Sequence, residues 1–239
     1  MNLEQQLITD PKVSAQSNHK YLGLLGMLWV TFLIINLFTA FKTFEIGGFV
    51  FAVVILTYPF VYIFADIFTE VYGYRVTRKV VWTGFFCMAL SSVIAYVYTL
   101  VPSPNFADSE AYNLIFKSSP IVAFFVILAF FCGELTNSYV VAKLKIFTEG
   151  KFINLRLVLS TLFGQLVDNS IAITGIFLFA GWFTSEQIIP LIISTVIFCT
   201  VWEIIALPIT RKAIRVIKRE EGLDTYDKGT NFNPFALHQ

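Results

Sequence analysis

The strongest constraint on the architecture of this chain comes from one stretch, Phe131-Cys132-Gly133-Glu134-Leu135-Thr136-Asn137-Ser138-Tyr139. It places a carboxylate and an amide inside an apolar run that begins near Pro120 and ends at Lys143 and Lys145. A helix rises about 1.5 Å per residue, so Glu134 lies roughly 13 Å from Lys143, near the middle of a hydrocarbon layer about 30 Å thick. An ionised group at that depth costs about 2.5–3.5 kcal/mol. We therefore expect a membrane protein in which Glu134 is paired, hydrated or offered to a substrate.

The composition agrees with a protein that lipid largely covers. Of 239 residues, 56% are apolar and 14% are charged, whereas a soluble domain is about one quarter charged. The three cysteines lie in apolar runs without a CxxC spacing, and the two histidines lie near the ends of the chain. We therefore expect no disulfide, metal site or cofactor. Motifs of intramembrane proteases are also lacking, so no enzyme is expected.

Six apolar segments are long enough to cross a bilayer. They are expected at residues 20–41, 47–68, 80–102, 119–143, 157–181 and 187–210. With the N-terminus inside, 15 of the 17 Lys and Arg residues fall on the inner side, and only Lys42 and Lys117 fall outside. The positive-inside rule then puts both termini in the cytoplasm. The predicted fold is all-α, an integral membrane six-helix bundle of residues 20–210 between a cytoplasmic N-terminal segment, 1–19, and a cytoplasmic tail, 211–239.

Polar residues recur at helical spacing in the later segments. Glu134 shares a face with Asn137, Gln165 shares one with Asp168, and Glu203 lies beside Trp202, whose ring could stack on a ligand. A fourth polar stripe lies in the second expected span and comprises Tyr58, Tyr62, Asp66, Thr69 and Glu70. Lipid cannot satisfy these groups, so their faces should turn inward to one shared cavity. A buried network that only holds the helices together is the alternative. The expected substrate-binding residues are Glu134, Asn137, Gln165, Asp168, Glu203 and Trp202.

A second group of polar residues lies nearer the expected inner interface. Asp66 and Glu70 precede a basic turn, which predicts a salt-bridged helix end or gate, with direct ligand contact as the weaker alternative. Pro59 falls inside the second expected span, where it would remove a helical hydrogen bond, so a hinge and a static kink are both open. The residues assigned a gate or structural role are Asp66, Glu70, Arg78, Lys79 and Pro59.

Small residues at spacing four predict close approach of two helices. The pairs are Ala129 with Gly133 and Ser160 with Gly164. Packing within the chain is the expected role, and a homodimer contact stays open.

The predicted site chemistry suits a flat polar heterocycle. A carboxylate can accept two parallel N–H bonds from the edge of a guanine-type base, and aromatic side chains can stack on its ring. A cationic amine or a proton shuttle would suit the same composition. Residue chemistry alone does not choose among these ligands.

Several motifs occur in a fixed order along the chain. They are Ala65-Asp66-Ile67-Phe68-Thr69-Glu70-Val71-Tyr72-Gly73-Tyr74 with Arg78-Lys79, Trp82, Gly84 and Phe85; Gly133-Glu134 with Asn137-Ser138, Lys143 and Lys145; Gln165 with Asp168 and Ser170; and Glu220-Glu221, Asp224, Tyr226-Asp227 and Asn231-Phe232-Asn233-Pro234-Phe235. Together they resemble the bacterial queuosine precursor transporter family, within the vitamin uptake transporters, over about residues 20–235.

The resemblance implies an importer in the bacterial inner membrane. Its implied cargo is a 7-deazaguanine base, such as 7-cyano-7-deazaguanine, a precursor of the tRNA nucleoside queuosine. The implied partners are this small molecule and the lipid bilayer, with no nucleic acid. Two alternatives stay open: the substrate-binding subunit of an energy-coupling vitamin uptake complex, and a membrane receptor or assembly protein. We expect the tail motif, 220–235, to pack under the inner face.

Overall fold

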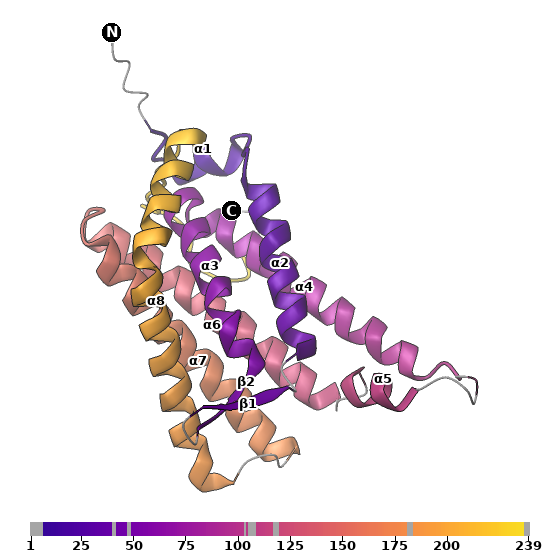
Figure 1. Cartoon of the computed structure of the whole chain (residues 1–239). Helices are drawn as coiled ribbons and strands as arrows, with labels where there is room; N and C mark the ends of the chain where they lie inside the picture. Colours follow the sequence, from indigo (N-terminus) through magenta and orange to yellow (C-terminus); the bar gives the residue numbers. More distant parts are fainter. Residues whose placement is uncertain are drawn as a thin grey trace.

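The computed structural model describes residues 7–39, 42–46, 49–102, 104, 109–116, 120–180 and 184–236. This part of the chain is helical apart from one short hairpin (Figure 1). Its helices are α1 (Pro11–Gln16), α2 (Leu22–Thr39), α3 (Tyr58–Tyr72), α4 (Tyr74–Thr99), α5 (Ser109–Phe116), α6 (Pro120–Phe147), α7 (Ile153–Ala180) and α8 (Ser185–Glu221). The strands are β1 (Thr43–Ile46) and β2 (Phe49–Ala52), and a 3-10 helix, η1 (Val53–Leu56), follows them.

Among the described residues, five helices are long and apolar enough to cross a membrane. They are α2, α4, α6, α7 and α8, and the mean hydropathy of their apolar windows runs from 1.5 to 2.3. These five match five of the six predicted spans. α8 is longer than predicted, because it continues past residue 210 to Glu221. The predicted limits at 41, 47, 119 and 181 lie outside the described residues.

The second predicted span, 47–68, is wrong as a continuous helix. Residues 49–52 form β2, which pairs antiparallel with β1 from Thr43↔Ala52 to Ile46↔Phe49, and α3 begins only at Tyr58. The sequence carries the reason, since two runs rich in aromatic and β-branched residues flank Gly47-Gly48. That pattern favours a hairpin over a helix.

Pro59 also differs from its prediction. It lies in the first turn of α3, where a missing N–H removes no helical hydrogen bond. Pro59 therefore breaks no helical hydrogen bond, which was the basis for predicting a hinge or a kink there. The prolines inside a helix are instead Pro190 and Pro208 of α8.

α3 occupies the centre of the bundle although it has only 15 residues. It contacts α2, α4, α6 and α8, and Figure 1 shows it between them. Eleven of its 15 residues are buried, as expected for a helix enclosed on all sides. Trp29 of α2 is fully buried and donates its Nε1–H to the carbonyl of Val61, at 3.0 Å. Phe68 packs in the same apolar core.

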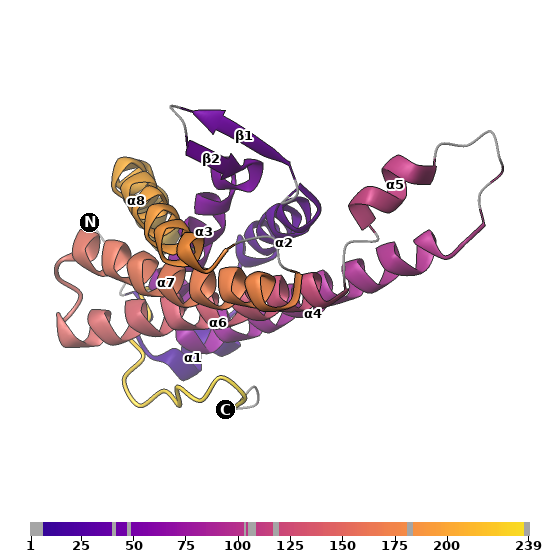
Figure 2. The ribbon, with the colours of Figure 1, turned by 90° about the horizontal axis from the view of Figure 1, so that it is seen from below.

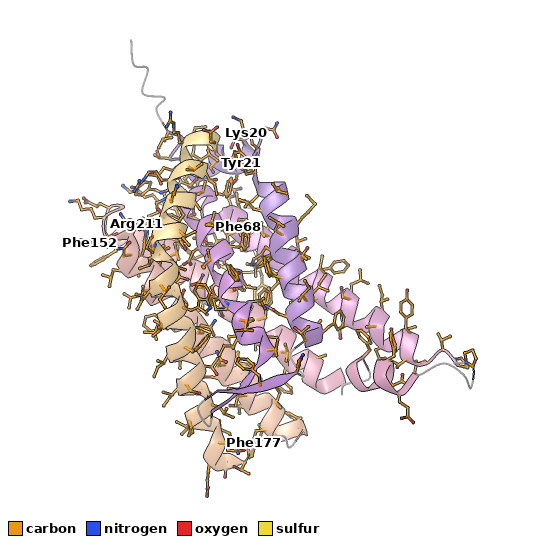
Figure 3. All side chains as sticks on the ribbon, viewed as in Figure 1. Lys20, Tyr21, Phe68, Phe152, Phe177 and Arg211 are labelled. Atoms are coloured by element: carbon orange, nitrogen blue, oxygen red, sulfur yellow. The ribbon has the colours of Figure 1, made fainter. Side chains whose placement is uncertain are left out.

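The two ends of the bundle differ in what they carry. α1 and the last turns of α8 lie at one end, called here the terminal end, and β1, β2 and the start of α8 lie at the other, the hairpin end (Figure 1). Lys20 and Tyr21 lie at the terminal end and Phe177 lies toward the hairpin end (Figure 3). Figure 2 shows that α5 and the second half of α4 extend away from the other helices.

The tail, defined here as residues 223–236, packs against the junction of α3 and α4. Asp227 accepts the backbone N–H of Tyr74 at 2.9 Å, so it satisfies one of the donors that the first turn of α4 leaves free. Gly73 links the two helices with φ of 83°, and a Cβ there would lie 2.6 Å from Cγ2 of Thr225. The junction therefore requires glycine. The tail therefore packs against the helix ends, and the place under the inner face expected for 220–235 stays a prediction.

Arg78 anchors this tail. Its buried guanidinium donates to the carbonyl oxygens of Asn231, at 2.8 Å, and Asn233, at 2.5 Å, and also to that of Ala236. Trp82 adds a bond from Nε1–H to the carbonyl of Pro234, at 2.8 Å. The tail is thus held by side chains of α4.

Replacing Arg78 with methionine should release the tail, because bonds from a charged donor contribute about 1.5–3 kcal/mol each. Trypsin should then cleave the purified protein after Lys228 at least about tenfold faster than it cleaves the wild type. Lys79→Met is the matched control, since Lys79 is exposed, and should leave the rate unchanged. Equal rates for Arg78→Met and wild type would contradict the anchoring role.

Candidate functional site

Four carboxylates from four helices meet inside the bundle. Asp66 of α3, Glu134 of α6, Asp168 of α7 and Glu203 of α8 form what we call the acidic cluster, and none is more than 4% exposed. Asp66 lies within electrostatic reach of Glu203, and Glu134 lies within reach of both Asp66 and Asp168. None of the four forms an ion pair within the described part of the chain. The four polar faces, including that of Asp66, therefore turn inward together, as their helical spacing predicted.

Neutral donors from neighbouring helices satisfy part of the cluster. Asn137 donates its Nδ2–H to Oδ1 of Asp66 at 2.8 Å. The hydroxyls of Tyr58 and Tyr62 both donate to Oδ2 of Asp168, the latter at 3.3 Å. These donors stabilise Asp66 and Asp168 without bringing a positive charge into the bundle.

Other polar atoms of the site are buried without a hydrogen-bond partner among the described residues. Buried polar atoms in proteins are nearly always hydrogen-bonded, so a group of exceptions in one place is typical of a ligand site. Carboxylate oxygens accept, so the group calls for a ligand that offers several N–H or O–H donors. The unpartnered atoms are both carboxylate oxygens of Glu134 and of Glu203, Oδ2 of Asp66, Oδ1 of Asn137, Oγ of Ser138, Oγ1 of Thr161 and Nε2 of Gln165.

Two glycines bring α6 and α7 together at the cluster. A Cβ at Gly133 would lie 2.7 Å from Cβ of Asp168 and 3.0 Å from the carbonyl oxygen of Gly164. A Cβ at Gly164 would lie 3.1 Å from the carbonyl oxygen of Gly133. The small-residue spacing therefore serves helix packing within the chain, as predicted.

Glu70 lies one helical turn beyond Asp66 and is fully neutralised. Arg156 donates from Nε and Nη2 to its two oxygens at 2.8 and 2.7 Å, and Lys218 lies at 2.6 Å. Lys145 lies 3.5 Å from Glu70 and 2.7 Å from Asp224 of the tail. Lys218 also contacts Asp224 at 2.6 Å. These five residues, the Glu70 network, tie together the same four helices that supply the acidic cluster.

The network corrects the predicted partners of the gate group. Glu70 is salt-bridged as expected, but its cations come from α6, α7 and α8 rather than from the basic turn that follows it. Arg78 binds the tail carbonyls, and Lys79 is exposed. Asp66 belongs to the acidic cluster instead. The sequence prediction failed because it paired charges by their separation along the chain.

Trp202, a predicted binding residue, packs against a neighbouring aromatic side chain. Its half-buried ring packs edge-on against Phe60, with 5.6 Å between ring centroids. Successive residues of a helix point about 100° apart, so Trp202 and Glu203 do not point in the same direction. Gln165 stays at the site, where its Oε1 accepts from Asn169 at 2.8 Å.

Sequence reasoning did not assign a role to Tyr58 and Tyr62, which share a helical stripe with Asp66. It also missed Arg156 as the partner of Glu70. The available signal was a lone arginine among apolar residues at the start of α7. Such a residue needs a buried anion nearby.

Long apolar helices that enclose an unneutralised polar site define a multi-pass membrane protein of the transporter class. The family model described as "Putative vitamin uptake transporter" matches residues 52–213. The chain belongs to this family, so it is a transporter and not an enzyme.

One curated relative extends the match to most of the chain. The "Probable queuosine precursor transporter" of Bacillus subtilis (strain 168) is 28% identical over 208 residues, which cover 85% of this chain and 90% of the relative. No solved structure matches the chain.

Gly133→Ala should lower the melting temperature of the purified protein. The added methyl would overlap Asp168 and Tyr62, and such overpacking costs about 1–3 kcal/mol. Gly26→Ala in α2 is the matched control, because nothing lies within 4 Å of a Cβ at that position. A Gly133→Ala protein as stable as the Gly26→Ala protein would contradict the close approach of α6 and α7.

Proposed function

We propose that this transporter imports 7-deazaguanine precursors of queuosine, such as 7-cyano-7-deazaguanine, across the bacterial inner membrane. The name of the Bacillus subtilis relative supports this class of cargo. The chemistry of the acidic cluster supports it independently, since a guanine-type edge presents several N–H donors in one plane.

The observation that carries the proposal is Glu134, which is fully buried with both carboxylate oxygens unpartnered. A carboxylate in this state accepts two parallel N–H bonds from the edge of the base. The free Nε2 of Gln165 then supplies a donor for the carbonyl oxygen of the base. Asp168 lies within electrostatic reach of Glu134, Asn137 offers its free Oδ1, and Glu203 offers two further acceptor oxygens.

The aromatic contact to the base is assigned to Tyr58 and Tyr62. Their rings lie 5.8 Å apart and their hydroxyls reach Asp168. Stacking on an aromatic ring contributes roughly 1–3 kcal/mol per base in nucleic-acid systems. Trp202, which packs on Phe60, is a less suitable stacking partner.

We assign the Glu70 network to closure of the terminal end. It joins α3, α6, α7 and α8 immediately beyond the acidic cluster. A cargo that leaves toward this end needs the four helices to separate, and separation breaks the ion pairs. Asp224 of the tail is the most exposed member of the network, with a side chain that is 23% exposed. We assign it the contact that holds the network closed from the tail side.

Six membrane crossings, with both termini in the cytoplasm, complete the proposal. α3 is the sixth crossing, although it falls short of the length of the other five. Lys20 and Arg211, two of the cations assigned to the inner side, lie toward the terminal end (Figure 3). Of the two assigned outside, Lys42 adjoins β1, and Lys117 lies outside the described residues. The segment boundaries 1–19, 20–210 and 211–239 stay predictions.

Glu134→Gln should insert normally but lose uptake, because an amide cannot accept both N–H bonds of the base. Loss of a bond to a charged group predicts roughly a 10- to 100-fold lower initial rate. The measurement is uptake of labelled 7-cyano-7-deazaguanine into liposomes that contain this chain alone. Glu186→Gln, at an exposed position of α8, is the control. Wild-type uptake by Glu134→Gln would contradict the role of Glu134, and no uptake by the wild-type chain alone would favour a subunit of a larger complex.

Glu70→Gln should open the terminal end, because removing one member of a buried ion pair costs about 3–5 kcal/mol. With Cys87→Ser and Cys132→Ser in place, Cys199 is the sole cysteine, and it lies within electrostatic reach of Asp168. A membrane-impermeant thiol reagent added from the terminal side should modify Cys199 at least about tenfold faster in Glu70→Gln.

Asp224→Asn is the milder second variant and should also raise the rate. Glu220→Gln, an exposed acid at the end of α8, should not. Unchanged modification of Cys199 in both Glu70→Gln and Asp224→Asn would reject the gate.

A further inference from the structure

A cavity of about 1110 Å³ opens at the terminal end, and no residue of the acidic cluster or of the Glu70 network lines it. Its walls come from three parts of the chain: the segment 9–16, the start of α4 and the tail. The cavity is therefore separate from the acidic cluster. It lies where the two ends of the described chain meet.

Backbone bonds hold these walls in place. The N–H of Ile8 donates to the carbonyl of Gly222 at 2.8 Å, and the N–H of Asp224 donates back to Ile8 at 2.9 Å. Tyr226 continues the pairing to Thr9 at 2.9 Å. The N-terminal segment and the tail are thus joined as a short parallel bridge. A pocket with walls fixed in this way is formed before any ligand arrives.

The cavity carries an excess of positive charge. Lys12, Arg75 and Lys228 line it, against one carboxylate, Asp10. Oδ1 of Asp10 accepts the backbone N–H of Lys12 at 2.7 Å, and the single negative charge of Asp10 leaves the three cations in excess. Within the described chain, none of the three cations forms an ion pair.

Arg75 is the member whose position most requires an anion. Its Nε is buried and has no hydrogen-bond partner among the residues that the structure describes. Arg75 also lies in the first turn of α4, where the helix dipole is positive and disfavours a cation. The nearby carboxylate of Asp227 is occupied by the N–H of Tyr74 and the hydroxyl of Thr230.

We propose that this cavity binds a phosphate-bearing anion. A guanidinium with an unused Nε and two ammonium groups are the donors that phosphate oxygens prefer. The volume lies just above the usual range of about 300–1,000 Å³ for small-ligand pockets. Basic pockets beside membrane helices also take lipid headgroups, so the phosphate can belong to a soluble anion or to an anionic phospholipid. Either one would join the N-terminal segment, α4 and the tail through a single ligand.

The test uses the full chain in phosphatidylcholine nanodiscs and two probes, inorganic phosphate in solution and phosphatidylglycerol added to the disc. We expect at least one probe to raise the melting temperature. Arg75→Gln and Lys228→Gln should each raise the half-saturating probe concentration about tenfold, the loss expected for one charge-assisted bond. Lys228 is exposed, so its variant tests the site even if Arg75→Gln fails to fold.

Lys79→Gln is the control, because this exposed lysine of α4 does not line the cavity. Stabilisation by phosphate alone identifies a soluble anion, stabilisation by phosphatidylglycerol alone identifies a headgroup, and stabilisation by both supports the shared chemistry. The proposal is overturned if neither probe stabilises the wild type, if Lys228→Gln responds like the wild type, or if Lys79→Gln weakens the response equally.

Discussion

Four carboxylates buried without a cation impose the constraint on which this structure depends. A carboxylate removed from water needs hydrogen-bond donors, and lipid offers none. The helices that carry Asp66, Glu134, Asp168 and Glu203 must therefore surround one another, with α3 inside. Gly133 and Gly164 allow the closest of these approaches. The apolar surfaces of the same helices are left to face the membrane.

Asp66 and Glu70 are two buried acids on one helix, and their carboxylates are compensated differently. They lie one turn apart on α3, and both are fully buried. Glu70 is bonded by Arg156 and Lys218 on both of its oxygens, which leaves it little capacity for a ligand. Asp66 has neutral donors on one oxygen and none on the other. Charge compensation, rather than burial, therefore distinguishes Glu70 from Asp66.

The tail and the N-terminal segment pack against the helices and are part of the folded structure. Asp227 and Arg78 bind the tail to α4, and Asp224 makes it part of the Glu70 network. Burial raises the pKa of Asp227, although the N–H of Tyr74 and the hydroxyl of Thr230 favour its charged form. A segment that looks like a polar extension in the sequence thus couples the membrane helices to the cavity at the terminal end.

The order of residues was enough to predict three features. These are the membrane class, the five long helices and the inward faces of Glu134, Asp168 and Glu203. Apolar length and helical periodicity are properties of one segment at a time, so they survive without knowledge of its neighbours. The hairpin at β1 and β2 was missed because apolar length was given more weight than the β-branched and aromatic runs on both sides of Gly47-Gly48. The partners of Glu70, the hydrogen bonds from Tyr58 and Tyr62 to Asp168 and the packing of Trp202 on Phe60 needed the assembled bundle. Each of these depends on how far one helix is rotated and how closely it approaches another, and contacts between residues far apart in the chain set both quantities.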